Sequence, residues 1–477
     1  MMGARARMAI AAMLFCAYGV ATAAACSGPE LPAARYSQRN GALTEAEMTM
    51  ARVAWKYFEN NLHKESGLVN AVDGYPSTTM WDTASYIAAI VSAVELGIIP
   101  RKEAHDRLAA VIQTFNRMAF FRDELPNKVY HAKTVEKVDY TNKPGEIGFS
   151  AIDLGRLLIW LKIVKERYPE HAEGIDRFVL RWKFDNIVDK TGTLFGARLN
   201  EQKKVEYVQE GRLGYEEYAA KGFELWGIGT ELASKPEPYE IITAHCVDVP
   251  FDSRDPRKTH QHNYVVSESY VLDGVEFNWD LAQDRDTSDR RHSHEWMEEF
   301  AHRVYQAQEN RHRDTGIVTA RSEHQLDQEP YFVYDTVYTD GFAWNTITDT
   351  GKHVPQFAAV SLKAALGMWV LWKSEYTDLL FQKIVNTYDP AKGYFEGILE
   401  NGKGPIKTFT ANNNGIMLES LLYKAQGKLL RWGQGKPGLW EKSMNEPYGT
   451  NALTRFNFRR AGEACSSDGA ESGRPAC

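Results

Sequence analysis

Helical segments that are apolar on nearly every face alternate with amphipathic ones along this chain of 477 residues. Residues 80–97 and 148–168 are apolar almost throughout, whereas residues 101–119 and 171–183 each carry a single apolar face. A helix that is hydrophobic all round must be buried on two sides, and an amphipathic helix can cover it. The alternation therefore predicts an inner layer of buried helices with an outer layer around it.

Strand signals are few, and no repeat of fixed length is visible. Near alternation of apolar and polar residues within 315–349 predicts a short β insertion. We predict that residues 185–212 form a loop with a hairpin around residues 190–192. We predict that residues 236–261 form a long irregular connection. We therefore predict an all-α (α/α)6 toroid, built from antiparallel helices with small β insertions. The predicted helical segments are residues 43–62, 80–97, 101–119, 148–168, 171–183, 211–227, 265–277, 288–313, 356–372, 375–388 and 410–425.

The segment 211–227 carries an aromatic stripe that includes Tyr215, Tyr218 and Trp226 at helical spacing. The opposite face includes Glu217 and a lysine. In an ordinary surface helix that face is exposed to water. In an inner helix of a toroid it faces a central cleft, where an acid beside two tyrosine rings could serve a sugar substrate. The pattern alone allows both interpretations.

Five segments resemble a known fold family in the same order along the chain. They are TMWDTASYIAAI (79–90), GFSAIDLGRLLIWL (148–161), YEEYAAKGFELWG (215–227), SESYVLDGVE (267–276) and GYFEGILENGKGPIKTFTANNNGIMLESLLYK (393–424). Together they resemble a bacterial domain family of unknown function that is related to the glucoamylase-like toroids of endo-β-1,2-glucanases. The resemblance implies the fold more firmly than the substrate, and it implies that Glu217 is a general acid.

Glycoside hydrolysis requires one protonated carboxyl and one ionised carboxyl beside the scissile bond. We predict Glu217 as the proton donor and Asp340, in a turn between Tyr338 and Trp344, as the base. Asp82 is a third catalytic candidate, although an Asp at a helix start also serves as a cap. The resembling glucanases invert, which implies two carboxyls roughly 6.5–9.5 Å apart.

Other polar and aromatic residues lie beside these acids or in similar turns. Each has a structural alternative, since tryptophans also fill cores and short amides also make turns. For Asp153, an ion pair with Arg156 one helical turn away is the favoured interpretation. The predicted substrate-binding residues are Trp81, Tyr215, Glu216, Tyr218, Glu268, Trp344, Tyr394, Glu396, Asn412 and Asn414.

No metal or cofactor is predicted. His260 with His262, and His292 with His294, lack a firm third ligand for zinc. Residues 284–295 begin like a calcium loop but lack the required glycine at the sixth position. The net charge of −7, without a basic cluster, argues against a nucleic-acid partner. We expect a monomer.

Residues 1–25 have the pattern of a secretory signal: two arginines, then an apolar stretch, then a cleavage region of small residues. A linker (26–42), the helical domain (43–430) and a tail (431–477) follow. No later segment is apolar enough to span a membrane, so we expect a periplasmic or secreted protein. A lipid anchor at Cys26 is the lesser alternative. Cys465 and Cys477 suggest a disulfide in the tail, and Cys246 either pairs with Cys26 or is a buried free thiol.

Three functions compete on this basis. We favour an exported glycoside hydrolase acting on a bacterial polysaccharide such as a β-glucan or exopolysaccharide. A polysaccharide lyase on the same fold would need a Tyr or His base beside a cation that neutralises a uronate. A non-catalytic glycan-binding or assembly factor would present aromatic residues without a working carboxyl pair. Fold analogy alone cannot choose among them.

Overall fold

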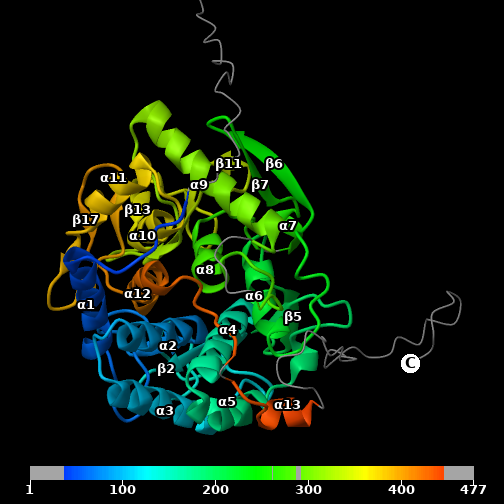
Figure 1. Ribbon diagram of the computed structural model, residues 1–477. Helices are drawn as coiled ribbons and strands as arrows, with labels where there is room; N and C mark the ends of the chain where they lie inside the picture. The colour runs from blue at the N-terminus through cyan, green and yellow to red at the C-terminus, as the bar shows by residue number, and fades with distance from the viewer. Residues whose placement is uncertain (1–36, 260, 286–291, 434, 445–477) are drawn as a thin grey trace, which may run out of the picture. The chain divides into compact units, whose positions relative to one another are not determined.

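Helices form most of the regular structure, and short strands connect them (Figure 1). The computed structural model describes residues 37–259, 261–285, 292–433 and 435–444. The predicted signal peptide, Cys26, His260, Cys465 and Cys477 lie outside the described residues, so signal cleavage and the pairing of the cysteines remain predictions. Cys246 is exposed and disulfide-bonded, so the alternative of a buried free thiol is wrong. No helix in the described part of the chain is long and apolar enough to cross a membrane.

Helices α1–α6 and α8–α12 overlap the predicted segments, whereas the short helices α7 and α13 were not predicted. Their bounds are α1 Glu45–Asn60, α2 Met80–Glu95, α3 Arg101–Arg117, α4 Ala151–Arg167, α5 Ala172–Val179, α6 Tyr215–Glu224, α7 Pro256–Thr259, α8 Glu268–Phe277, α9 Glu295–Thr315, α10 Leu362–Leu371, α11 Glu375–Ile384, α12 Ala411–Gln426 and α13 Leu439–Ser443. Three single 3-10 turns are η1 Pro169–His171, η2 Phe184–Asn186 and η3 Pro355–Phe357.

The strands form small antiparallel sheets of two or three strands each. The two-stranded sheets pair β1 Ser77–Thr79 with β2 Val129–His131, β6 Tyr239–Ala244 with β7 Val247–Asp252, β10 Tyr338–Thr339 with β11 Phe342–Ala343, and β14 Tyr388–Asp389 with β15 Gly393–Tyr394. The three-stranded sheets join β3 Gly148–Phe149, β4 Phe195–Leu199 and β5 Val205–Gln209; β12 Thr346–Ile347, β9 Phe332–Asp335 and β8 His324–Gln325; and β13 Ala359–Ser361, β16 Gly397–Leu399 and β17 Pro405–Ile406.

Six helices contact one another in a closed ring. Each of α2, α4, α6, α8, α10 and α12 contacts the next of the series, and α12 contacts α2 (Figure 1). The remaining longer helices pack outside them: α1 contacts α12, α3 contacts α2, α5 contacts α4, α9 contacts α8 and α11 contacts α10. The predicted alternation of inner and outer helices is thus present in the contacts.

Glycines allow the inner helices to approach closely. A Cβ added at Gly222 in α6 would lie 2.0 Å from the carbonyl oxygen of Gly155 in α4, and one at Gly415 in α12 would lie 2.9 Å from Ser85 in α2. Side chains at these positions would force the helices apart. The sequence places a glycine where two inner helices touch, so the ring can close tightly.

Small hydroxyl or glycine residues begin the inner helices. The N-caps are Thr79, Ser150, Gly214, Ser267, Ser361 and Thr410. The side chain of Thr79 accepts a hydrogen bond from the backbone of Asp82, and Ser150 does the same for Asp153. Such caps satisfy backbone donors at a helix start. They also fix where the polar residues of each first turn lie.

Two segments differ from the sequence prediction. Residues 236–261 contain the regular hairpin β6–β7 instead of an irregular connection, because Val247, Val249 and Phe251 alternate and bury one side. The face of α6 opposite the aromatic stripe is largely buried against other protein elements, and only Glu224 is partly exposed. Lys221 on that face is buried and pairs with Asp273 of α8 at 2.6 Å. The strands are also more numerous than the expected insertions.

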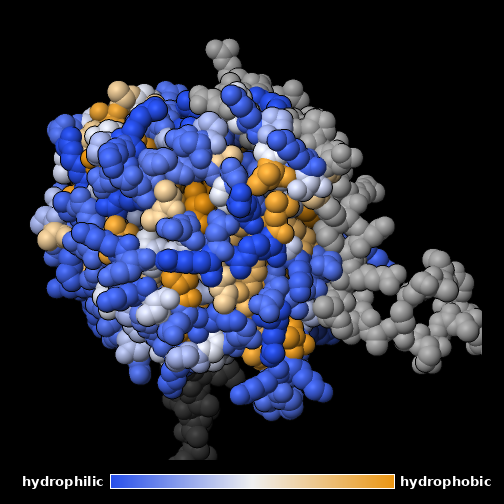
Figure 2. Space-filling view, turned by 90° about the horizontal axis from the view of Figure 1, so that it is seen from below, coloured by the Kyte–Doolittle hydropathy of each residue, from blue (hydrophilic) through white to orange (hydrophobic). Residues whose placement is uncertain are grey.

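Figure 2 shows the molecule from below the view of Figure 1, where hydrophilic side chains cover most of the described surface. Hydrophobic side chains appear on this face as small, separate groups. Scattered apolar side chains are normal on a protein surface. This visible part therefore lacks the broad apolar area that would indicate a protein-docking face.

Candidate functional site

First turns of the inner helices meet at one end of the ring. The Asn412 amide at the start of α12 donates to Glu268 Oε1 of α8 at 2.8 Å. Glu268 also pairs with Lys363 at the start of α10. Trp81 of α2 donates from its indole to Asn412 Oδ1 at 3.0 Å. Residues separated by more than 300 positions thus converge, because each stands just after the N-cap of its helix.

Two glutamates at this end have opposite pKa shifts. Burial raises the pKa of Glu268, but the charge and hydrogen bond of Lys363 outweigh it, and the pKa is lowered overall. Burial, and next the charge of Glu268, raise the pKa of neighbouring Glu323 to about 7. The Tyr215 hydroxyl donates to Glu323 Oε1 at 2.5 Å. Glu268 is therefore an ionised group and Glu323 an acid near neutrality.

A second acidic group lies at the starts of α2 and α4. Burial, and then the charge of Glu210, raise the pKa of Asp153 to about 7, and Asp82 contributes in the same direction. Glu210 accepts from the backbone of Ala151 at 2.5 Å. Burial also raises the pKa of Asp82, although Thr79 donates to its Oδ2 at 2.7 Å. Asp82, Asp153, Glu210 and Glu323 are all half-buried, so their carboxyls can reach a ligand.

Aromatic rings lie beside these groups. The Tyr215 ring lies 5.8 Å from Trp81 and 5.9 Å from Tyr264, and Tyr264 stacks on Tyr334 at 4.7 Å. Tyr334 interacts electrostatically with Glu323, Glu210 and Tyr140, and the Tyr140 ring is 67% exposed. Carboxyls surrounded by aromatic faces suit a ligand with hydroxyl groups and apolar ring faces.

A buried polar network supports the site from below. Arg156 donates to Asn412 Oδ1 at 3.0 Å and to Glu419 Oε1 at 2.7 Å, and its guanidinium lies 4.6 Å from the Trp81 ring. Burial raises the pKa of Glu396, beside Lys363, to about 7. The expected ion pair of Asp153 with Arg156 is wrong, because Arg156 points into the ring and pairs with Glu419.

Several residues predicted from the sequence come together in this site. Asp82, Trp81, Tyr215, Glu268 and Asn412 all lie in the first turns described above, and Glu396 lies beneath Lys363. Asp340 lies at the edge of this group of residues. Its carboxylate is hydrogen-bonded to His262 Nδ1 at 2.7 Å, and the His262 ring lies 6.0 Å from the Tyr334 ring.

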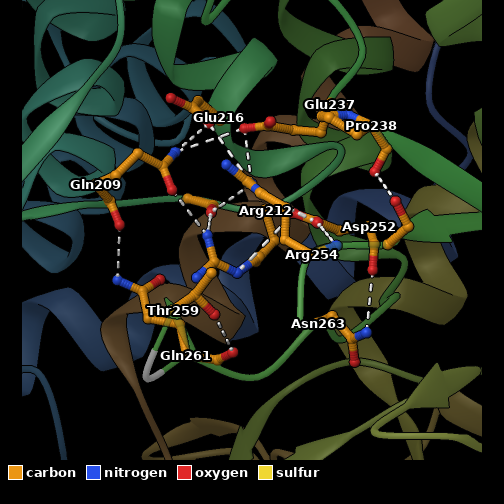
Figure 3. Close-up of polar contacts among 12 residues, drawn as sticks. Gln209, Arg212, Glu216, Glu237, Pro238, Asp252, Arg254, Thr259, Gln261 and Asn263 are labelled. Atoms are coloured by element: carbon orange, nitrogen blue, oxygen red, sulfur yellow. Dashed lines mark hydrogen bonds and ion pairs between the residues drawn. The ribbon is translucent and has the colours of Figure 1, made fainter. Parts of the chain in front are cut away.

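Glu216 belongs to a different polar network, at the start of α6 (Figure 3), and Glu217 follows it in the same first turn. Glu216 accepts from Gln209 at 2.6 Å, and Arg254 pairs with Glu237 at 2.7 Å in the same group. Glu217 accepts from the backbone of Gly214 at 2.7 Å and from that of Glu237 at 3.3 Å. Each glutamate is 1% exposed. Burial raises the pKa of Glu217 to about 8, yet both of its oxygens are occupied as a helix cap and a loop anchor.

Four other residues predicted to contact substrate lie outside this group of carboxyls, where they are buried or pack against other side chains. Tyr218, Tyr394 and Asn414 are 0% exposed, and their polar atoms bond to Glu276, Val385 and backbone groups. The Trp344 ring packs 4.6 Å from the Arg311 guanidinium of α9. Tertiary packing determines which partners these side chains contact, and helical periodicity carries no information about it.

The site also contains four residues that were not predicted from the sequence: Glu323, Lys363, Glu210 and Tyr264. Lys363 carried a usable signal, because it is a lone cation at the start of an otherwise apolar helix. Glu323 and Tyr264 lie outside the helices, in segments whose pattern predicts no direction for their side chains. Only the folded chain brings them to the ring.

The chain shares its fold with glucoamylase-like carbohydrate-active proteins. A glucoamylase candidate from Bacteroides caccae superimposes with a TM-score of 0.60 at 11% identity, covering 86% of this chain and 97% of its own. The endo-β-1,2-glucanase of Chitinophaga pinensis, solved with sophorotriose and glucose, gives a TM-score of 0.57 at 12% identity and covers 86% and 98%. At these identities the similarity concerns the fold alone.

The chain belongs to the DUF3131 family, described as proteins of unknown function, whose model matches residues 49–427. No curated protein matches the sequence. The predicted membership of a family of unknown function related to the glucoamylase-like domain is therefore confirmed.

Proposed function

We propose that this protein is a glycoside hydrolase built as an (α/α)6 toroid, acting on a bacterial polysaccharide. One observation carries the proposal: Glu268 and Glu323 have opposite pKa shifts at the end of a helical ring lined with tyrosines. Carboxyls whose pKa values are driven apart are typical of acid–base catalysts. The fold of the Chitinophaga pinensis enzyme makes a β-1,2-glucan the first substrate to test.

Glu323 is our proton donor. Its pKa of about 7 keeps a large fraction protonated at neutral pH, and it is half-buried and hence reachable. The Tyr215 hydroxyl fixes the orientation of the carboxyl. Donation to the glycosidic oxygen leaves Glu323 ionised beside Glu268, and the charge of Lys363 compensates for that repulsion.

The Asp82 and Asp153 pair supplies the base. One of these carboxyls, ionised, takes a proton from water while the water oxygen attacks the anomeric carbon and the bond to the leaving oxygen breaks. This assignment keeps Asp82 from the sequence hypothesis and replaces Glu217, whose oxygens are already bonded to backbone groups. Asp340, at the edge with His262, would contact a sugar unit further from the scissile bond.

The chemistry of the described residues disfavours a lyase. A tyrosine base needs a lowered pKa, whereas burial raises the pKa values of Tyr215 and Tyr264 well above the usual value. A uronate substrate needs an available cation, whereas Lys363 is already paired with Glu268. A space lined by carboxyls would also repel an anionic polymer.

We further propose that the protein acts after export, as a monomer, in the periplasm or outside the cell. The predicted signal at residues 1–25 supports export. A polysaccharide of the cell envelope is the substrate class that this location offers.

Reducing-end release from linear β-1,2-glucan and from a panel of bacterial exopolysaccharides tests the hydrolase. We expect Glu323→Gln to lower kcat by about 10²–10⁴-fold, the usual contribution of a general acid. Glu201→Gln, an exposed change in the β4–β5 turn, is the matched control.

Three results of that experiment would be decisive. Release by the wild type and by the Glu201 variant, but not by the Glu323 variant, supports the donor. Unchanged release by the Glu323 variant together with loss in a Glu217→Gln variant would restore the original assignment. No release from any polymer, alongside measurable glycan binding, would favour a binding or assembly factor.

A further inference from the structure

A group of three metal-ligating side chains lies in the outer layer, away from the carboxyl site. His105 of α3 and Glu170 with His171 of η1 place ligand atoms within 4.8 Å of one another. The two imidazole rings have centroids 4.6 Å apart. These residues come from two elements that contact each other. No local motif in the sequence joins these residues, since 65 positions separate His105 from Glu170.

The third residue of this group has an unsatisfied polar atom. His171 is 6% exposed, and its buried Nε2 has no hydrogen-bond partner. A buried polar atom without a partner is costly, and each such atom in a native protein needs an explanation. A bound cation would supply the missing partner. This observation is independent of the clustering itself.

Neighbouring cations are engaged elsewhere. Lys102 pairs with Asp106 at 2.6 Å and Arg107 with Glu103 at 2.8 Å, both within α3. Glu170 and His105 are exposed, so small rotations can bring their ligand atoms to the roughly 2.0–2.2 Å that zinc requires. Two imidazoles and one carboxylate favour a divalent transition ion over Mg²⁺ or Ca²⁺, which prefer oxygen.

We propose that His105, Glu170 and His171 bind a divalent transition ion of the Zn²⁺ class, which clamps α3 to the turn between α4 and α5. The role is structural. Helix α3 begins shortly after the end of α2, and η1 follows the end of α4, so the ion lies opposite the first turns that carry the carboxyls. Water completes its coordination on the exposed side.

Zn²⁺ binding to the full chain without an affinity tag, after treatment with EDTA, tests the proposal by calorimetry. We expect one saturable site and a higher Tm with Zn²⁺, because an ion that binds only the folded state stabilises it. His105→Asn and Glu170→Gln, both at exposed positions, should each weaken binding by more than about tenfold. His353→Asn, an exposed histidine elsewhere, should bind like the wild type.

Co²⁺ provides an independent readout, since its visible absorption reports nitrogen ligands. The bands should appear in the wild type and be lost or altered in the His105 variant. Equal Zn²⁺ affinity in the wild type, His105→Asn and Glu170→Gln would overturn the site, as would binding only at millimolar concentrations. Glycan hydrolysis should be the same with and without EDTA, which separates this site from the proposed catalytic one.

Discussion

At the scale of single residues, the same burial has opposite consequences for two adjacent glutamates. Burial disfavours the charged form of both Glu268 and Glu323, but Lys363 forms an ion pair with Glu268 and not with Glu323. The charge that lysine stabilises on Glu268 then raises the pKa of Glu323. One lysine therefore separates the roles of two otherwise similar side chains.

The pH dependence of hydrolysis should report this coupling. The donor Glu323 must be protonated, so kcat/KM should fall as pH rises through about 7. The base should be ionised, so kcat/KM should also fall on the acid side, where the pKa of Asp153 is about 7. In Glu268→Gln the negative neighbour is lost and the pKa of Glu323 falls. In the Glu268→Gln variant, the alkaline limb of the kcat/KM profile should therefore move to lower pH, while the acid limb stays at the same pH. An unmoved alkaline limb would contradict the coupling.

The same lysine should be important for stability. Lys363→Met leaves Glu268, which is 1% exposed, without its cation, and breaking a buried pair costs about 3–5 kcal/mol. Urea denaturation should show this loss. The double variant, Lys363→Met with Glu268→Gln, removes both charges and should recover most of the lost free energy of unfolding. Lys56→Met, which breaks an exposed pair with Glu59, is the control and should change the midpoint little. If the change in unfolding free energy of the double variant equals the sum of the changes in the two single variants, the two residues are not coupled.

At the scale of helices, tight contacts depend on glycine. Gly222→Ala would place a Cβ 2.0 Å from the carbonyl oxygen of Gly155, so α4 and α6 must separate. We expect a loss of about 1–3 kcal/mol or more in the free energy of unfolding, measured in urea. Gly145→Ala is the control, since no heavy atom lies within 4 Å of its added Cβ. Equal midpoints for the two variants would mean that the helices adjust without cost.

Sequence patterns predicted elements better than contacts between them. Helix α1 begins within the predicted segment 43–62, at a Thr44–Glu47 capping box that depends only on neighbours three residues apart. The second face of α6 was ambiguous because Lys221 and Glu217 are polar, and only their partners explain their burial. Those partners, Asp273 and the backbone of Glu237, come from later elements.

The site was predictable in part for the same reason. Asp82, Glu268 and Asn412 stand at helix starts, where a local signal exists. Glu323 meets Tyr215, 108 positions earlier, through a contact that no local pattern encodes. The resemblance to a family pointed to α6, but it could not show that Glu216 of this helix belongs to a polar network with Gln209 and Arg254 (Figure 3).

At the scale of the whole molecule, the closed ring predicts that damage on one side spreads to the other. Each inner helix is buried against two neighbours, so separating α4 from α6 removes support from every later contact of the ring. In Gly222→Ala, hydrogen exchange of the slowest amides of α10, across the ring, should therefore accelerate by the same factor as those of α6. Exchange that accelerates in α4 and α6 alone would show that the ring opens locally. In that case the first turns of α8, α10 and α12, which carry the proposed site, stay assembled while their neighbours unfold.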